Sequence, residues 1–270
     1  MKTRIITAVV LVPLLLIIVW ALPKIFTAIL FAAMAAIGAY ELLHSTDYVR
    51  HPRLTIYSMV MAFLVGLWSG VGAERAWMVL GVLCFVALLF GEMMLSHVKM
   101  RFEIMTICMA AGLLVPFLFT SLVRIHSGLD GRFYIVVPFL MAFVPDTGAY
   151  FAGRAFGRHK LAPVISPNKT IEGAVGGVIA CMVGMVLYGL ILQAFFQFKV
   201  NYLLALVYGL VGSVGAVFGD LCFSVIKRQT GIKDYGSIFP GHGGILDRFD
   251  SMMVVGPLAE ALLLLIPMAV

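Results

Sequence analysis

The chain has 270 residues, of which 62% are hydrophobic and only 12% are charged, and its formal net charge is +6. A soluble protein carries about 25% charged residues, so a single soluble core is excluded and lipid must be the solvent for much of the apolar surface. In a membrane protein the positive excess is first an orientation signal and only then a hint about ligands.

Apolar runs long enough to cross a bilayer recur along the whole chain. The first, 5–22, follows Lys2 and Arg4 and is too long for the apolar part of a cleaved signal peptide, so we expect an uncleaved membrane helix. All nine runs are expected to be helices, because lipid admits only helices and closed barrels and these runs do not alternate. The other eight ranges are 25–43, 54–71, 77–96, 104–123, 133–153, 171–194, 201–226 and 252–269.

The distribution of Lys and Arg predicts the orientation of these spans. With the N-terminus in the cytoplasm, the segments on that side carry 14 of the 19 Lys and Arg residues. This is the excess that cytoplasmic loops show. The connections 154–170 and 227–250 then face the cytoplasm, and the C-terminus lies outside. We expect an all-α polytopic membrane protein, with a transmembrane scaffold in 1–130 and a catalytic region in 131–270.

The first polar constellation lies at the end of the sixth predicted span. Asp146, Tyr150 and Arg154 run along one side of that helix, and Pro145 is expected to kink it and to free a carbonyl. An acid inside a span with no evident structural need favours a functional site. The alternative, a basic cytosolic connection with a helix cap, stays open.

The connection that follows leads into the seventh predicted span. We interpret Ser166–Glu172 as a turn and an N-cap, with Thr170 as the capping residue and Glu172 in the first helical turn. Lys169 lies within this segment, next to the expected cap.

Asp220 lies about one and a half turns before the cytoplasmic end of the eighth predicted span. Ser224 and Lys227 follow at i+4 and i+7, so the three side chains share one helix face. A carboxylate at this depth, aligned with a hydroxyl and an ammonium group, favours a ligand or ion site over a structural hydrogen bond between helices.

Charge and glycine are concentrated in the stretch 224–250. Its basic residues suit phosphate oxygens, its glycines let the backbone approach a ligand, and its carboxylates suit a hard divalent cation. Capping of the ninth helix needs one acid, whereas two stand here, which favours metal ligation by at least one. His242 is a candidate for phosphate contact or proton transfer, or else for structuring the loop. The residues concerned are Lys227, Arg228, Lys233, Asp234, Gly241, His242, Gly243, Gly244, Asp247, Arg248 and Asp250.

These residues resemble the signature of the phosphatidate cytidylyltransferase family, also called CDP-diacylglycerol synthases. Residues 224–250 carry the pattern S-x-x-K-R-x4-K-D-x-G-x-x-F-P-x-H-G-G-x-x-D-R-x-D without a gap. The segments 146–150 and 166–173 are also similar to that family, so the resemblance is dense from about 143 to 251.

The resemblance implies an integral enzyme of the bacterial inner membrane that joins CTP and phosphatidic acid into CDP-diacylglycerol and releases pyrophosphate. It implies Mg²⁺, with or without a second cation, a homodimer, and no nucleic-acid partner. The implied metal ligands are Asp220 and Asp247, with Asp146 and Asp250 close by. Catalytic roles are expected for Asp220, Asp247, Lys227, Arg228 and His242. Substrate binding is expected for Lys169, Ser224, Lys233, Asp234, Gly243, Gly244, Arg248 and Arg154.

Two other function classes stay open. A transporter would also have many spans and buried acids, but it would not need this cluster of charge on one side. A CTP-dependent lipid kinase would transfer the γ-phosphoryl group instead. A CDP-alcohol phosphotransferase is disfavoured, because the chain has no D-x-x-D-G-x-x-A-R run. The isolated acids of the spans are interpreted as helix–helix hydrogen bonds or interface residues outside the site; they are Glu41, Glu92, Glu103 and Glu260.

Overall fold

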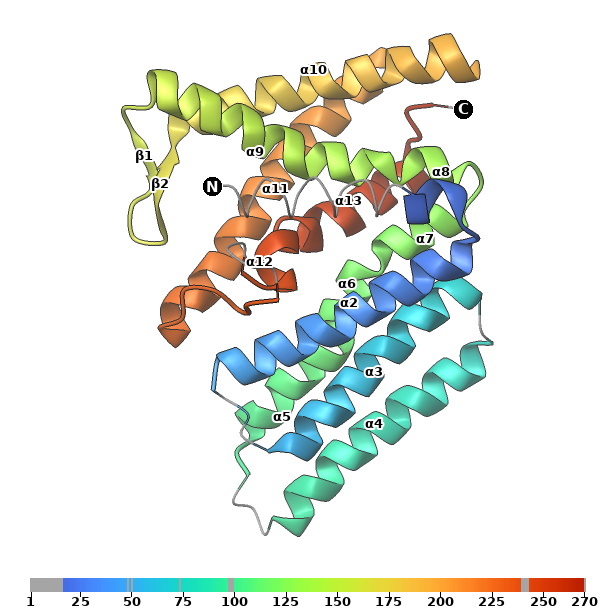
Figure 1. Ribbon diagram of the computed structural model, residues 1–270, viewed down its shortest axis with the longest axis vertical. Coiled ribbons are helices and arrows are strands. Elements are labelled where there is room, and N and C mark those ends of the chain that lie inside the picture. Colours follow the sequence, from blue (N-terminus) through green and yellow to red (C-terminus); the bar gives the residue numbers. More distant parts are fainter. Residues whose placement is uncertain are drawn as a thin grey trace. The chain divides into compact units, whose positions relative to one another are not determined.

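The computed structural model describes residues 17–47, 49, 51–72, 74–96, 100–238 and 243–269, and these are mostly helical (Figure 1). The chain divides into two units, each with its own internal packing. The first holds Met1–Leu129 and Gln229–Phe249, and the second holds Asp130–Arg228 and Asp250–Val270.

The first unit is built around helices α2 (Lys24–Ser45) and α3 (Pro52–Val71), which pack along their length, with α4 (Arg75–Leu95) beside α3 (Figure 1). Small residues allow the close approach of α2 and α3, since a Cβ added at Gly66 would overlap Ala32 and one at Gly70 would overlap Ala28. The short helix α12 (Ile245–Phe249) packs on α2.

The predicted span 104–123 is a helical path interrupted twice. It consists of α5 (Phe102–Met109), a π-helical turn η1 (Ala110–Leu114), α6 (Val115–Phe119) and α7 (Ser121–Ser127). Pro116 stands at the start of α6, and the Thr120 hydroxyl donates to the Pro116 carbonyl at 2.7 Å. Proline and π-helical turns are the usual causes of such breaks.

The second unit contains α8 (Gly131–Tyr134), α9 (Val136–Phe156), α10 (Ile171–Phe196), most of α11 (Tyr202–Thr230) and α13 (Met252–Leu265). Helices α9 and α10 lie side by side and form its most extensive pairing (Figure 1). A Cβ at Gly177 would stand 2.6 Å from the Pro145 carbonyl oxygen, and one at Gly148 would overlap Ala180. Glycine at these positions therefore lets the two backbones meet. Helix α9 continues through Pro145, which is buried.

A small antiparallel hairpin connects α9 to α10, which the sequence interpretation did not predict. Its strands are β1 (Lys160–Ala162) and β2 (Ser166–Thr170), with Lys160 opposite Thr170. The interpretation of Ser166–Glu172 as a turn was wrong, because the turn is at residues 163–165 and Ser166–Thr170 is a strand. The predicted cap is confirmed, since Thr170 Oγ1 accepts a hydrogen bond of 3.1 Å from the Gly173 N–H.

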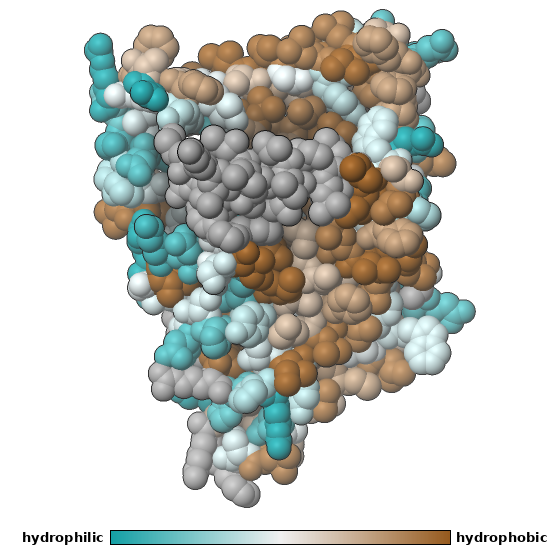
Figure 2. All heavy atoms as spheres, in the orientation of Figure 1, coloured by the Kyte–Doolittle hydropathy of each residue, from teal (hydrophilic) through white to brown (hydrophobic). Residues whose placement is uncertain are grey.

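Within the described residues, seven helices are long and apolar enough to cross a membrane, and they coincide with the second to eighth predicted spans. The first predicted span, 5–22, lies largely outside the described residues, and the ninth corresponds to α13, which ends at Leu265. The count of nine therefore stays a prediction. Apolar side chains face outward, as on α10, where Ile179, Val183 and Leu187 are exposed; hydrophobic residues cover this helix in Figure 2. The expected all-α polytopic membrane protein is confirmed.

Candidate functional site

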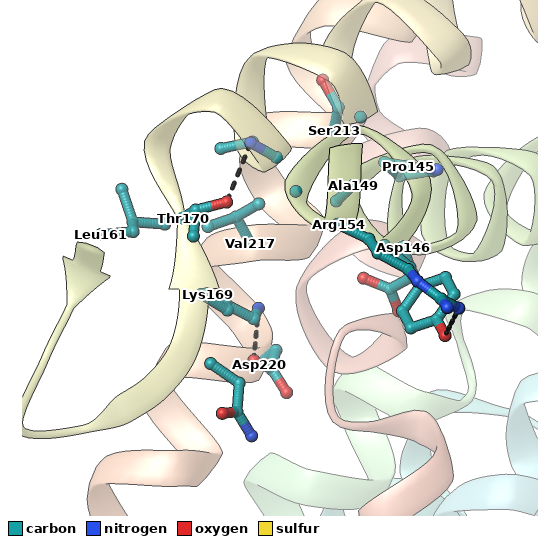
Figure 3. Close-up of a pocket in the computed structure, with 16 residues that line it drawn as sticks. Pro145, Asp146, Ala149, Arg154, Leu161, Lys169, Thr170, Ser213, Val217 and Asp220 are labelled. Atoms are coloured by element: carbon teal, nitrogen blue, oxygen red, sulfur yellow. Dashed lines mark hydrogen bonds and ion pairs between the residues drawn. The ribbon is translucent and has the colours of Figure 1, made fainter. Parts of the chain in front are cut away.

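A cavity of about 610 Å³ lies in the second unit, lined by residues of α9, α10, α11 and the β1–β2 hairpin (Figure 3). Most of its lining is small or apolar, but four charged side chains reach it: Asp146 and Arg154 from α9, Lys169 from β2, and Asp220 from α11. Its size is within the range of about 300–1,000 Å³ typical of small-molecule sites. Both charge signs in a cavity lined mostly by small or apolar residues indicate a site for a charged ligand.

The three residues predicted to share one side of α9 do face the cavity. Asp146, Tyr150 and Arg154 all line the cavity, and Arg154 Nη1 donates to the Tyr150 hydroxyl at 3.4 Å (Figure 3). The guanidinium group is exposed and keeps further donors for an anion.

Lys169 and Asp220 form an ion pair across the cavity, between Nζ and Oδ2 (Figure 3). Two anchors hold the hairpin that carries Lys169. Thr170 caps α10, and Arg228 Nε of α11 donates to the Ile165 carbonyl in the hairpin turn at 3.1 Å. The predicted substrate-binding lysine is therefore fixed beside a predicted metal ligand.

Asp250 lies close to Asp220 within the same unit, since a Cβ added at the adjacent Gly219 would stand 3.0 Å from the Asp250 carbonyl oxygen. The Asp250 side chain is buried, and its Oδ1 accepts from the Ser251 N–H at 2.8 Å. Burial first, and then the charge of Asp220, raises the pKa of Asp250 to about 7, while Lys227 acts in the opposite direction. Two neighbouring carboxyl groups of this kind favour a shared proton or a bound cation.

This pair fits the implied cation. In the described part of the chain, no three carboxylate, imidazole or thiol groups gather into a ready-made metal site. Mg²⁺ often takes only one or two protein carboxylates and completes its shell with water and substrate phosphates. The oxygen donors of Asp220 and Asp250 match that requirement.

Asp247 belongs to the first unit, where it structures the glycine-rich loop. Its side chain is buried, and Oδ2 accepts hydrogen bonds from the N–H groups of Tyr235 at 2.7 Å and Gly244 at 3.0 Å. Gly243 has φ of 84° and stands close to this carboxylate, so glycine is required there on both grounds. The convergence of Asp247 with Asp220 stays a prediction.

The other predicted site residues divide between the units. On α11, Ser224 and Lys227 are half-buried and Arg228 is exposed; none of the three lines the cavity. In the loop of the first unit, Lys233, Asp234 and Arg248 are exposed. His242 lies outside the described residues, so its expected role stays a prediction.

Several residues of interest were not singled out from the sequence. Asn168 and Ser213 line the cavity. The interpretation of Glu41 as a source of helix–helix hydrogen bonds is confirmed, since its carboxylate on α2 accepts from backbone N–H groups at the start of α12, but the sequence did not indicate this partner. The only signal for Glu41 in the sequence was an acidic residue within an apolar run. Glu92 does link two helices, since it accepts from the Tyr57 hydroxyl at 3.2 Å.

The comparisons with known proteins agree with one another on the family. Residues 2–266 match the sequence model described as the cytidylyltransferase family. Proteins named phosphatidate cytidylyltransferase are similar to this chain. The one from Staphylococcus haemolyticus is 49% identical over 135 residues, 50% of each chain. That from Staphylococcus saprophyticus is 42% identical over 177 residues, 66% of each chain, and one from Staphylococcus epidermidis is 50% identical over 135 residues, 50% of each chain. The matches thus span about half to two thirds of the length of these relatives.

Proposed function

The chain belongs to the cytidylyltransferase family, and from this we propose that it is a phosphatidate cytidylyltransferase. It would convert CTP and phosphatidic acid into CDP-diacylglycerol and pyrophosphate. The curated relatives carry this name, and the cavity chemistry supports the same reaction.

The observation that carries the proposal is the charged cavity of the second unit. Lys169 and Arg154 offer donors for phosphate oxygens, and Asp220 offers oxygen ligands for the counter-cation of a polyphosphate. Both substrates are anions, so their encounter is repulsive unless cationic groups lie between them. A cavity with cations and carboxylates at adjacent positions meets that need.

The reaction is an in-line substitution at phosphorus. An oxygen of the lipid phosphate attacks the α-phosphorus of CTP, the new P–O bond forms, and the bond to the β-phosphate oxygen breaks, so that pyrophosphate leaves with its electron pair. Positioning and charge neutralisation provide most of the catalysis in such transfers. The lipid phosphate monoester is already largely ionised near neutral pH, so no strong general base is needed.

In this proposal the basic residues contact phosphate groups and the acidic residues hold the metal ion. Lys169 and Arg154 orient phosphate groups in the cavity, and Lys227 and Arg228 provide two further basic groups in the last turn of α11. Asp220 and Asp250 would hold Mg²⁺, which supplies neutralisation of the developing charge. Asp247 and Asp146 are the further predicted ligands, and Lys233 and Arg248 the further predicted phosphate contacts.

The two substrates would reach this site from different phases. CTP is soluble and would arrive from the cytoplasm, in accord with the excess of Lys and Arg predicted on that side. The lipid would arrive sideways from the inner membrane. Exposed apolar side chains flank the cavity residues on α9 and α11, among them Phe151, Val214 and Phe218, and they suit contact with acyl chains. We also propose that two copies of this chain form a homodimer.

Purified protein in mixed micelles with phosphatidic acid tests the proposal. With CTP labelled at the α-phosphate, label should enter the lipid and pyrophosphate should appear. With CTP labelled at the γ-phosphate, transfer of the label to the lipid would instead identify a lipid kinase. Uptake of a solute into proteoliposomes with no lipid product would identify a transporter.

A further inference from the structure

Glu41 of α2 binds the backbone at the start of α12, within the first unit. Its side chain is only 2% exposed. Oε1 accepts from the Ile245 N–H at 3.0 Å, and Oε2 accepts from the Leu246 N–H at 2.9 Å. The first N–H groups of a helix have no partner within it, so this carboxylate satisfies two donors at once.

Glycines in the loop make room for this carboxylate. A Cβ added at Gly236 or at Gly244 would overlap the carboxyl group of Glu41. One turn earlier on α2, a Cβ at Gly38 would touch the Leu246 side chain at 3.2 Å. Both sides of the contact therefore lack side-chain bulk where the loop meets the acid.

The same loop segment is held from a second direction by Asp247 and from a third by Ser45. The Asp247 carboxylate accepts from Tyr235 and Gly244, and Ser45 Oγ donates to the Tyr235 carbonyl. Because Glu41 and Ser45 are one turn apart on α2, a single rigid helix fixes both edges of the loop. The orientation of Asp247 therefore depends on α2.

We infer that Glu41 is a positioning residue for the Gly243–Arg248 segment, an inference that rests on the proposed cytidylyl transfer. Its negative charge, not only its shape, is required. Glutamine at this position would keep one acceptor but turn an NH₂ donor toward the second backbone N–H, leaving that buried group unsatisfied. The segment would then shift and carry Asp247 with it.

The test compares Glu41→Gln with Glu92→Gln in the purified full chain. Glu92 undergoes the same chemical change in the same unit, but it binds Tyr57 and has no role in the proposed site. Amide hydrogen exchange of the peptide around residues 243–249 should become about tenfold faster in Glu41→Gln only. The Mg²⁺ concentration for half-maximal rate should also rise about tenfold, an effect that loss of folded protein alone would not produce.

Gly236→Ala provides a second variant, since it displaces the Glu41 carboxylate without altering any proposed substrate or metal group. It should reproduce both effects, and it decides the matter if Glu41→Gln does not fold. Unchanged exchange, or faster exchange with an unchanged Mg²⁺ requirement, would overturn the inference. If the unmodified protein transfers no cytidylyl group, the proposed function fails, and the exchange measurement still decides whether Glu41 holds the loop.

Discussion

The ammonium group of Lys169 and the carboxylate of Asp220 form an ion pair that joins strand β2 to helix α11 (Figure 3). The two side chains are 26% and 24% exposed, so both remain accessible from the cavity that they line. Phosphate oxygens bind ammonium groups, and hard cations bind carboxylates. A metal-bound polyphosphate could therefore replace this one pair with two new contacts, one to each partner.

Asp220→Asn should lower kcat by about 10³-fold or more, because it removes a negative charge where the reaction needs a cation ligand. The amide has nearly the same shape, so the protein should still insert and fold. Transfer of α-labelled phosphate from CTP to lipid measures kcat, and size-exclusion chromatography with thermal unfolding reports the fold.

Asp130→Asn is the matched control for that variant. Asp130 lies in the same unit with φ of 51°, a conformation that asparagine also tolerates. The activity of Asp130→Asn should stay within about twofold of that of the unmodified protein. Near-normal turnover in Asp220→Asn would remove Asp220 from the proposed metal site.

Lys169→Gln should raise the KM for CTP or for phosphatidic acid about tenfold, the loss expected for one hydrogen bond to a charged phosphate. Lys160→Gln, on the opposite strand of the hairpin, is the control, since Lys160 is exposed and is not among the cavity-lining residues. Steady-state kinetics with each substrate varied in turn separates the two KM values. An unchanged kinetic profile in Lys169→Gln would count against phosphate contact.

Gly177→Ala should destabilise the protein by about 1–3 kcal/mol, because the new methyl group would stand 2.6 Å from the Pro145 carbonyl oxygen and force α9 and α10 apart. Gly91→Ala in α4 is the control. Nothing lies within 4 Å of its added Cβ, so stability should stay equal or rise by about 0.4–1 kcal/mol. Unfolding midpoints in detergent compare the two, and equal midpoints would show that the α9–α10 contact tolerates a methyl group.

Sequence patterns predicted the features that depend on local composition. The long helices α2, α3, α4, α10 and α11 follow from the length of their apolar runs. The Thr170 cap follows from a hydroxyl placed before an apolar run with an acid in the first turn. Asp146 and Asp220 were identified as acids within predicted spans, and Lys169 and Arg154 were implied by the family resemblance, although the shared position of all four needed the fold.

The features that sequence patterns missed depend on tertiary contacts. Ser166, Pro167 and Asn168 are poor strand formers, and the hairpin is held instead by Arg228 and by the Glu172 carboxylate, which accepts from the Arg158 N–H at 3.1 Å. The contact of Glu41 with Ile245 joins residues 204 positions apart. No periodicity or local motif in a single sequence encodes a pairing at that separation.

The last prediction separates the two roles of Asp247, as the residue that structures its loop and as the proposed metal ligand. Asp247→Asn retains an oxygen that can accept from Tyr235 and Gly244, so the loop should keep its amide exchange protection. Loss of the negative charge should nevertheless lower kcat by about 10²-fold or more. Asp247→Ala should lose both activity and protection, because it leaves two buried N–H groups without their acceptor. Full activity in Asp247→Asn would show that its role is confined to the loop.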